Sequence, residues 1–147
     1  MPLAAPLAAC GFQPAYAPGG PARALQGQVE VTDPSDKYGF DLVTRLEERM
    51  GRASNPKYRL SYVIKARETR VAITRYQVVG KIDYTLTNLD TGKVVTSGEV
   101  NSFTSYSAAG NTVSTLTDEA FARTRLMTIL ADQIMTRLIA TAGTWAK

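Results

Sequence analysis

Hydrophobic and polar residues alternate along two stretches in the middle of the chain. In residues 57–66 the even positions are aromatic or aliphatic, from Tyr58 to Ala66, and the odd positions are mostly charged or polar. The same alternation runs over residues 75–87, where the even positions include Tyr76, Ile82 and Leu86. A period of two places successive side chains on opposite faces of a strand. The pattern therefore predicts two strands, each with one face toward a core and one toward solvent.

Two further strands are predicted on either side of this pair. Residues 25–32 alternate over a shorter length, and the polar residues 33–36 end that strand. Residues 93–106 predict a fourth strand, although their alternation is less regular. Residues 88–92 are expected to form the hairpin loop before it, with Gly92 in the left-handed conformation. Residues 107–116 are small and polar, so we expect them to form a loop.

In two other segments the apolar residues recur every three or four positions, as one face of a helix requires. The first helix is expected over residues 38–50, with an N-cap among residues 33–36 and Gly51 as the C-cap. Its apolar face carries Tyr38, Leu42, Val43, Leu46 and Met50. The second helix is expected to begin at Thr117, as its N-cap, and to end at Gly143. Charged residues interrupt its wide apolar stripe too often for a membrane span, so the stripe indicates core packing.

The order strand, helix, strand, strand, strand, helix predicts an α+β fold. Two amphipathic helices and a mostly antiparallel, four-stranded sheet with one apolar face can bury their apolar surfaces against each other. Both helices cover that face, which gives a two-layer sandwich. Residues 25–147 are expected to form this single domain, which is long enough to bury a core. Residues 10–24 contain several prolines and glycines and are expected to be a flexible tether.

The composition excludes most kinds of catalysis. The chain has no histidine and one cysteine, so it lacks the commonest general base at neutral pH and the commonest transition-metal ligand. An intrachain disulfide and a cysteine-rich metal site are both excluded. No Walker-type or dinucleotide-binding glycine motif is present, and the 13 Asp and Glu residues show no spacing typical of an acid–base pair. We therefore expect no catalytic residues, no metal and no cofactor.

The single cysteine, Cys10, follows Leu7, Ala8 and Ala9. This sequence matches a lipobox, in which small residues precede a cysteine that is lipidated and becomes the mature N-terminus. Only residues 1–9 precede Cys10 and none of them is basic, so we interpret them as the remnant of a lipoprotein signal peptide. Several acyl chains on Cys10 would hold the protein on a membrane without a spanning helix. The alternative is a disordered leader rich in Ala and Pro with an incidental thiol.

The positive charge is concentrated in one part of the chain. The net charge is +4, yet residues 57–81 carry seven basic residues against Glu68 alone. These basic residues are Lys57, Arg59, Lys65, Arg67, Arg70, Arg75 and Lys81. All except Arg70 lie at odd positions, opposite the apolar face. They predict a basic outer face of the sheet and a basic hairpin tip.

The basic region has two interpretations. The first is an ordinary solvated sheet surface, on which Lys and Arg protect strand edges from pairing. The second is a docking surface for a polyanion, because arginine binds phosphate and carboxylate groups through paired hydrogen bonds. A lipoprotein outside the cytoplasm would not meet nucleic acid, so we expect an anionic lipid head group and no nucleic-acid partner.

Several short motifs occur in order along nearly the whole chain. They are Cys10-Gly11-Phe12-Gln13-Pro14-Ala15-Tyr16, Arg75-Tyr76-Gln77-Val78, Gly98, Ser105-Tyr106, Leu130-Ala131-Asp132-Gln133-Ile134 and Arg137-Leu138. In this combination the chain resembles the LptE family of lipopolysaccharide (LPS)-assembly lipoproteins. The resemblance implies the order of strands and helices predicted above. It also implies an outer-membrane lipoprotein that faces the periplasm, plugs and helps assemble the large β-barrel LptD, and assists delivery of LPS to the outer leaflet.

The resemblance also implies candidate ligand-binding residues. Family members bind LPS through basic residues, one of them in the loop between the second and third strands. In this chain the corresponding basic residues, which are the candidates for LPS binding, are Lys65, Arg67, Arg70 and Arg75. A second basic region of the family, after the fourth strand, has no counterpart, because residues 102–122 contain no Lys or Arg. Either LPS binding rests on the hairpin alone, or the protein acts mainly as a plug.

Two other functions remain open at the level of sequence. A periplasm-facing lipid carrier, or an auxiliary lipoprotein of an ABC-type lipid export system, would need a hydrophobic cavity between sheet and helices. A hydrolase that uses carboxylates would need a deep polar pocket with paired Asp or Glu residues.

Overall fold

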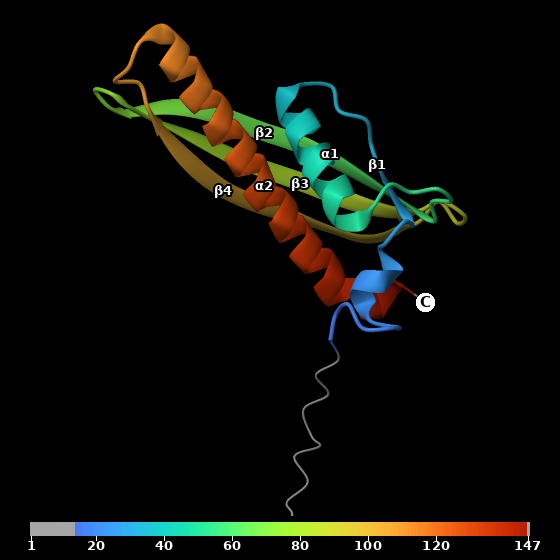
Figure 1. Ribbon diagram of the computed structural model, residues 1–147. Helices are drawn as coiled ribbons and strands as arrows, with labels where there is room; N and C mark the ends of the chain where they lie inside the picture. The colour runs from blue at the N-terminus through green and yellow to red at the C-terminus, as the bar shows by residue number, and fades with distance from the viewer. Residues whose placement is uncertain (1–13, 147) are drawn as a thin grey trace, which may run out of the picture.

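The computed structural model describes residues 14–146. Cys10 and the predicted signal-peptide remnant lie outside them. The elements, in chain order, are the short 3₁₀ helix η1 (Pro21–Ala24), β1 (Val29–Val31), α1 (Lys37–Met50), β2 (Tyr58–Ala72), β3 (Arg75–Asn88), β4 (Val94–Ser107) and α2 (Thr112–Trp145) (Figure 1). The predicted order of strands and long helices is confirmed.

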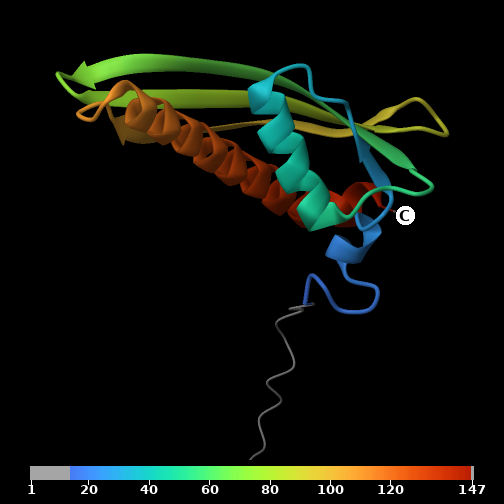
Figure 2. The same cartoon turned by 45° about the horizontal axis from the view of Figure 1, so that its top comes forward.

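The four strands form one sheet in the order β1-β2-β3-β4. The short strand β1 runs parallel to β2, and the other two pairs are antiparallel. Both helices lie on the same face of the sheet, with α2 over β3 and β4 and α1 beside it (Figure 2). The α+β class and the mostly antiparallel sheet are therefore confirmed.

The core lies between the sheet and the two helices. Inward side chains of the strands, such as Leu60 and Ile82, meet Leu42 of α1 and Leu130 and Ile134 of α2, and all five are fully buried. At Gly80 of β3 a Cβ atom would lie 3.0 Å from methyl groups of two α2 leucines, so glycine lets the helix approach the sheet. No helix formed by residues 14–146 combines the length and apolar character that a membrane span requires.

The first helix agrees with the prediction at both ends. The Asp36 carboxylate accepts a hydrogen bond from the backbone N–H of Gly39 at 2.7 Å, so Asp36 is the N-cap expected among residues 33–36. Gly51 follows the last turn with a φ of 74°, a conformation that glycine adopts without strain. Gly92 also has the positive φ predicted for the loop between β3 and β4.

The second helix is longer than predicted at both ends. It begins at Thr112, because the Asn111 side chain accepts from the Ser114 N–H at 2.8 Å and caps it, so the loop predicted up to residue 116 is wrong beyond Asn111. Gly143 does not end it either. The helix continues to Trp145, whose ring packs edge-on against Tyr58 at 5.1 Å, and this tertiary contact outweighs the weak helix preference of glycine.

The strand boundaries also differ from the prediction. The first strand, β1, is shorter than the predicted residues 25–32 and covers only Val29–Val31, because Gly27 has a positive φ and turns the chain just before it. The second strand continues past residue 66 to Ala72, since β3 offers a pairing partner along the whole length. The expected loop between these strands is consequently a tight turn at residues 73–74.

The segment before the domain is packed where the structure describes it. Residues 14–24 form turns and η1, with Ala22 buried and the following Leu25 fully buried. The Tyr16 hydroxyl accepts a hydrogen bond from the Arg49 guanidinium at 3.2 Å. The packed part of the chain thus begins before residue 25, the boundary that the sequence predicts.

Candidate functional site

The four predicted LPS-binding residues all lie on the β2–β3 hairpin, and the structure separates them into two kinds. The Lys65 ammonium pairs with Asp83 of β3 at 3.4 Å. The Arg70 guanidinium donates to the backbone carbonyls of Ala72 and Ile73, at 3.2 and 2.6 Å, and so ties down its own turn. Lys65 and Arg70 are therefore engaged within the hairpin.

Arg67 and Arg75 are the two candidates with unengaged charge. Both side chains are exposed, on the outer side of the hairpin near its tip. Neither has an acidic partner within 4.0 Å among residues 14–146. Two exposed guanidinium groups on one hairpin can bind phosphate oxygens without first breaking an internal ion pair.

The rest of the outer sheet face is less basic than the sequence predicts. Arg59 pairs with Glu30 of β1, and Lys81 pairs with Glu99 of β4. These acidic residues, like Asp83, lie outside the basic stretch in the sequence but opposite it in the sheet. These ion pairs compensate part of the basic outer face that the sequence predicts, whereas Arg67 and Arg75 of the hairpin have no acidic partner among residues 14–146.

The acidic residue of the hairpin, Glu68, does not neutralise this tip. Glu68 lies opposite Val78, at a position that faces the helix side of the sheet rather than the outer side. Burial raises the pKa of the Tyr106 hydroxyl well above its ordinary value, and the Glu68 carboxylate raises it further. Tyr106 also stacks on Tyr76 at 5.4 Å. Glu68 is thus associated with this tyrosine pair.

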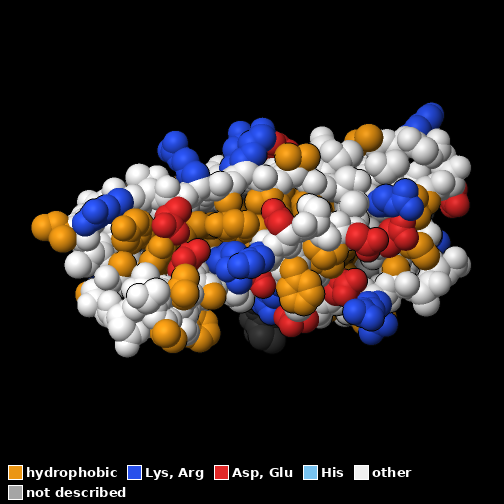
Figure 3. All heavy atoms as spheres, turned by 90° about the horizontal axis from the view of Figure 1, so that it is seen from above, with side chains coloured by type: hydrophobic (Ala, Val, Ile, Leu, Met, Phe, Trp, Pro, Cys, Tyr) orange, Lys and Arg blue, Asp and Glu red, His pale blue; other side chains and the backbone are white. Residues whose placement is uncertain are grey.

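Apolar residues surround the same tip, a feature that sequence reasoning missed. The side chains of Val71 and Ile73 are 52% and 84% exposed, and Val113 and Leu116 of α2 are 74% and 60% exposed. The backbone N–H of Ala108 donates to the Thr74 carbonyl at 2.7 Å, which holds the approach to α2 against the hairpin turn. Figure 3 shows hydrophobic side chains at this end of the molecule with Lys and Arg nearby.

The signal for this apolar tip was present in the sequence. Val71 and Ile73 are unusual residues for a solvated turn, although charged residues surround them in the sequence. Val113 and Leu116 lie in the segment predicted as a loop, where their spacing of three was not recognised as the start of a helix. Large exposed apolar groups gathered in one place are typical of interaction sites.

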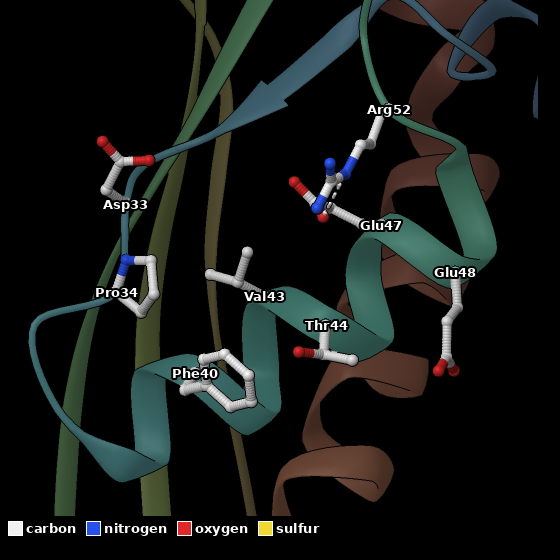
Figure 4. Close-up of a pocket in the computed structure, with 8 residues that line it drawn as sticks. All are labelled: Asp33, Pro34, Phe40, Val43, Thr44, Glu47, Glu48 and Arg52. Carbon is white, nitrogen blue, oxygen red and sulfur yellow. Dashed lines mark hydrogen bonds and ion pairs between the residues drawn. The ribbon is translucent and has the colours of Figure 1, made fainter.

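A hollow of about 500 Å³ lies between α1 and the loop after β1. Phe40 and Val43 contribute apolar surface, and Asp33 faces the hollow from the loop (Figure 4). The Glu47 carboxylate is held by Arg52 at 3.2 Å, and Glu48 points away. The hollow therefore lacks the pair of available carboxylates that a hydrolase of this type would need. Residues 14–146 also hold no cluster of metal-ligating side chains.

Comparison with known proteins identifies the family. The family model of LptE, described as lipopolysaccharide-assembly, matches residues 26–138, which is most of the chain. The chain belongs to the LptE family. Membership of LptE supports a role in LPS assembly, and LptE is a non-enzymatic lipoprotein family. No curated protein sequence matches the chain.

Solved structures share the fold of this LptE-family chain. A candidate lipoprotein of Caulobacter crescentus matches with a TM-score of 0.73 at 15% identity, over 83% of this chain and 96% of that one. A minor lipoprotein of Acinetobacter baumannii gives 0.57 at 16% identity, over 78% and 90% of the two chains. The rare lipoprotein B of Shewanella oneidensis gives 0.57 at 10% identity, over 78% and 93%. The sandwich is thus shared at low sequence identity.

Proposed function

We propose that this protein is a non-enzymatic outer-membrane lipoprotein that plugs an LptD-type β-barrel, helps assemble it and assists delivery of LPS to the outer leaflet. The observation that carries the proposal is the LptE family match over residues 26–138. The fold is consistent with it, because its four-stranded sheet and two helices enclose one continuous core.

The surface of the sandwich suits a plug. Large membrane barrels have polar interiors, and a protein inside one must present a mostly polar, solvated surface. The outer sheet face of this chain carries ion pairs between neighbouring strands, such as Lys81–Glu99 and Lys65–Asp83. Its core is filled by large side chains, including Leu126 and Met127 of α2. A filled body of this kind can occupy a lumen without offering a channel of its own.

The hairpin tip is our proposed LPS contact. Arg67 and Arg75 would bind phosphate groups of LPS directly, whereas Lys65 and Arg70 would add positive charge while keeping their partners in the hairpin. LPS bound in this way would have its anionic part at the end of the molecule that also carries exposed apolar side chains.

The proposed anchor is Cys10, acylated as the first residue of the mature protein. Two or more acyl chains would hold the protein on the periplasmic side of the outer membrane, since each buried CH₂ contributes about 0.8 kcal/mol. The mass of the mature N-terminal peptide tests this part. Acyl chains on Cys10 are expected, and an unmodified thiol on a chain that retains residues 1–9 would contradict it.

A crosslinked pull-down from outer membranes tests the proposed function. The expected result is co-purification of a large β-barrel protein, and depletion of this chain should leave that barrel misassembled and surface LPS reduced. Normal barrel folding and normal surface LPS after depletion would overturn the proposal. The alternative function, a lipid carrier, would need a hydrophobic cavity between the sheet and the helices. In residues 14–146 that space is filled by buried side chains, most of them aliphatic.

A further inference from the structure

Strand β4 is an open edge of the sheet. It has 14 residues, Val94–Ser107, and it pairs with β3 on one side only. Within residues 14–146 no other strand pairs with its outer side. In an antiparallel sheet the backbone N–H and C=O groups of alternate residues on such an edge point away from the neighbouring strand. A long row of donors and acceptors is therefore available along β4.

The usual protection of an exposed edge is absent from β4. Proteins commonly protect long edge strands with lysine, proline, bulges or very short length. Residues 94–107 contain no Lys, Arg or Pro, and their one charged residue, Glu99, is paired with Lys81. Pairing with β3 is regular from Ser107 back to Thr96, and its irregularity lies at the far end, near Val94. The edge is thus regular over most of its length.

The edge of β4 and the side of α2 form the walls of a groove. One hollow of about 570 Å³ lies between Asn101 of β4 and Ile129, Gln133 and Arg137 of α2. A second, of about 590 Å³, lies between residues 105–107 of β4 and α2 residues that include Asp118 and Arg125. The two hollows lie one after the other along the boundary between β4 and α2. A peptide that paired with β4 would direct every second side chain against α2.

The α2 wall of this groove carries two arginines without an acidic partner among residues 14–146, against one unpaired carboxylate, Asp118. Arg125 and Arg137 are both exposed, whereas the nearby Asp132 already binds Arg45 and Arg49 of α1. Burial raises the pKa of the Tyr84 hydroxyl, and the positive charge of Arg137 opposes that effect. That hydroxyl lies over β4, because a Cβ atom on Gly98 would be 2.6 Å from its oxygen.

We propose that an extended acidic segment of another polypeptide binds along β4 as a fifth strand of the sheet, with its carboxylates at Arg125 and Arg137. Twelve residues separate the two arginines on α2, which corresponds to roughly 18 Å along the helix axis. A strand covers that length in about five residues. Side chains on one face of a strand are an even number of residues apart, so the segment carries acidic residues four or six positions apart.

Charge favours such a partner over a second copy of this chain. Antiparallel pairing of two β4 strands would bring two identical α2 sides next to each other, each net positive because Arg125 and Arg137 face one unpaired carboxylate, Asp118. Like charges at such a seam oppose association. Binding of such a segment along β4 would require neither LPS contact nor the lipid anchor.

The test uses nine-residue synthetic peptides of alternating Thr and Val, with Glu at the third and seventh positions. The peptide is titrated into the purified protein and followed by NMR and amide hydrogen exchange. The expected result is slower exchange of the β4 amides, with shifts confined to β4 and α2. A peptide with Lys at the same two positions should bind about tenfold more weakly at low salt, because two attractions become repulsions.

Two variants and one modified peptide complete the design. The double variant Arg125→Glu and Arg137→Glu should reverse the preference and bind the Lys peptide better, whereas Arg52→Glu, at an exposed arginine after α1, should leave it unchanged. Methylation of the peptide nitrogens that face β4 should abolish binding. The proposal is overturned if the Glu peptide leaves β4 exchange unchanged at millimolar concentration, if Glu and Lys peptides bind equally, or if the protein pairs with itself through β4.

Discussion

The β2–β3 hairpin is one long antiparallel pair of strands, but its two ends have opposite surroundings. At the base, Leu60 and Leu86 lie opposite each other and are fully buried under the helices. At the tip, Val71 and Ile73 are exposed, and the arginines beside them have no acidic partner among the described residues. Alternation in sequence sets which face a side chain takes. It does not say whether another element covers that face, so the tip must be understood as a surface and the base as core.

The largest expected effect separates base from tip by stability. Leu86→Ala at the base should lower the free energy of unfolding by about 2–5 kcal/mol, because a cavity remains where the buried side chain was. Ile73→Ala at the tip is the matched control and should change it by less than about 0.5 kcal/mol. Urea unfolding followed by circular dichroism measures both. Equal losses in the two variants would mean that the tip is packed like the base.

A second change probes how closely the helix covers the middle of the hairpin. Gly80→Val would place methyl groups against Leu126 and Leu130, where even a Cβ atom lies at 3.0 Å. We expect a loss of about 1–3 kcal/mol from overpacking. The control Val79→Ala alters the neighbouring outward position and should have a much smaller effect. Thermal unfolding distinguishes them, and an unchanged melting temperature for Gly80→Val would show that α2 is free to move away from β3.

The third prediction concerns the link between the helices that cover the base. Arg123 of α2 donates to Asp41 of α1 at 3.0 Å, and both side chains are mostly buried, with 20% and 15% exposed. Arg123→Ala leaves the Asp41 carboxylate with only the Thr124 hydroxyl and should cost about 1–2 kcal/mol. Arg52→Ala removes a well-exposed ion pair and is the control, with a smaller expected loss. A loss no greater for Arg123→Ala than for the control would contradict this role.

The smallest expected effect is on ligand binding at the tip. Arg67→Glu combined with Arg75→Glu should weaken LPS binding several-fold at low salt and less at high salt, because exposed charges are screened. Arg59→Glu, at the base of the same outer face, is the control, since Arg59 already pairs with Glu30. Binding of labelled LPS at two ionic strengths measures the difference. Equal affinities for the parent protein and the double variant at low salt would show that the tip arginines do not contribute to LPS binding.

The elements that sequence reasoning predicted well are those in which local pattern and tertiary surroundings agree. Regular alternation identified β2 and β3, and the capping residues Asp36 and Gly51 set the ends of α1. Strand β4 was less clear because its inner face is not simply apolar. The Thr104 hydroxyl is buried and donates to the Ala122 carbonyl, and Gly98 leaves room for the Tyr84 ring.

The parts of the site that could not be predicted depend on register between distant strands. The sequence alone does not show that Asp83 lies near Lys65, or that Glu99 lies near Lys81, because each pair joins neighbouring strands diagonally. The turn that engages Arg70 is likewise set by the irregular pairing at the end of β2. Charge counting along the chain therefore overestimated the basic surface and could not separate Arg67 and Arg75 from their neighbours.

The packing of η1 has a geometric consequence. Figures 1 and 2 place η1 beside the C-terminal end of α2, while the hairpin tip lies beyond the N-terminal end of that helix. The 34 residues of α2 span roughly 50 Å at 1.5 Å per residue. The point where the chain enters η1 and the hairpin tip therefore lie at opposite ends of the body. Attachment of the N-terminal segment at one place would set how far from that place the tip arginines can reach.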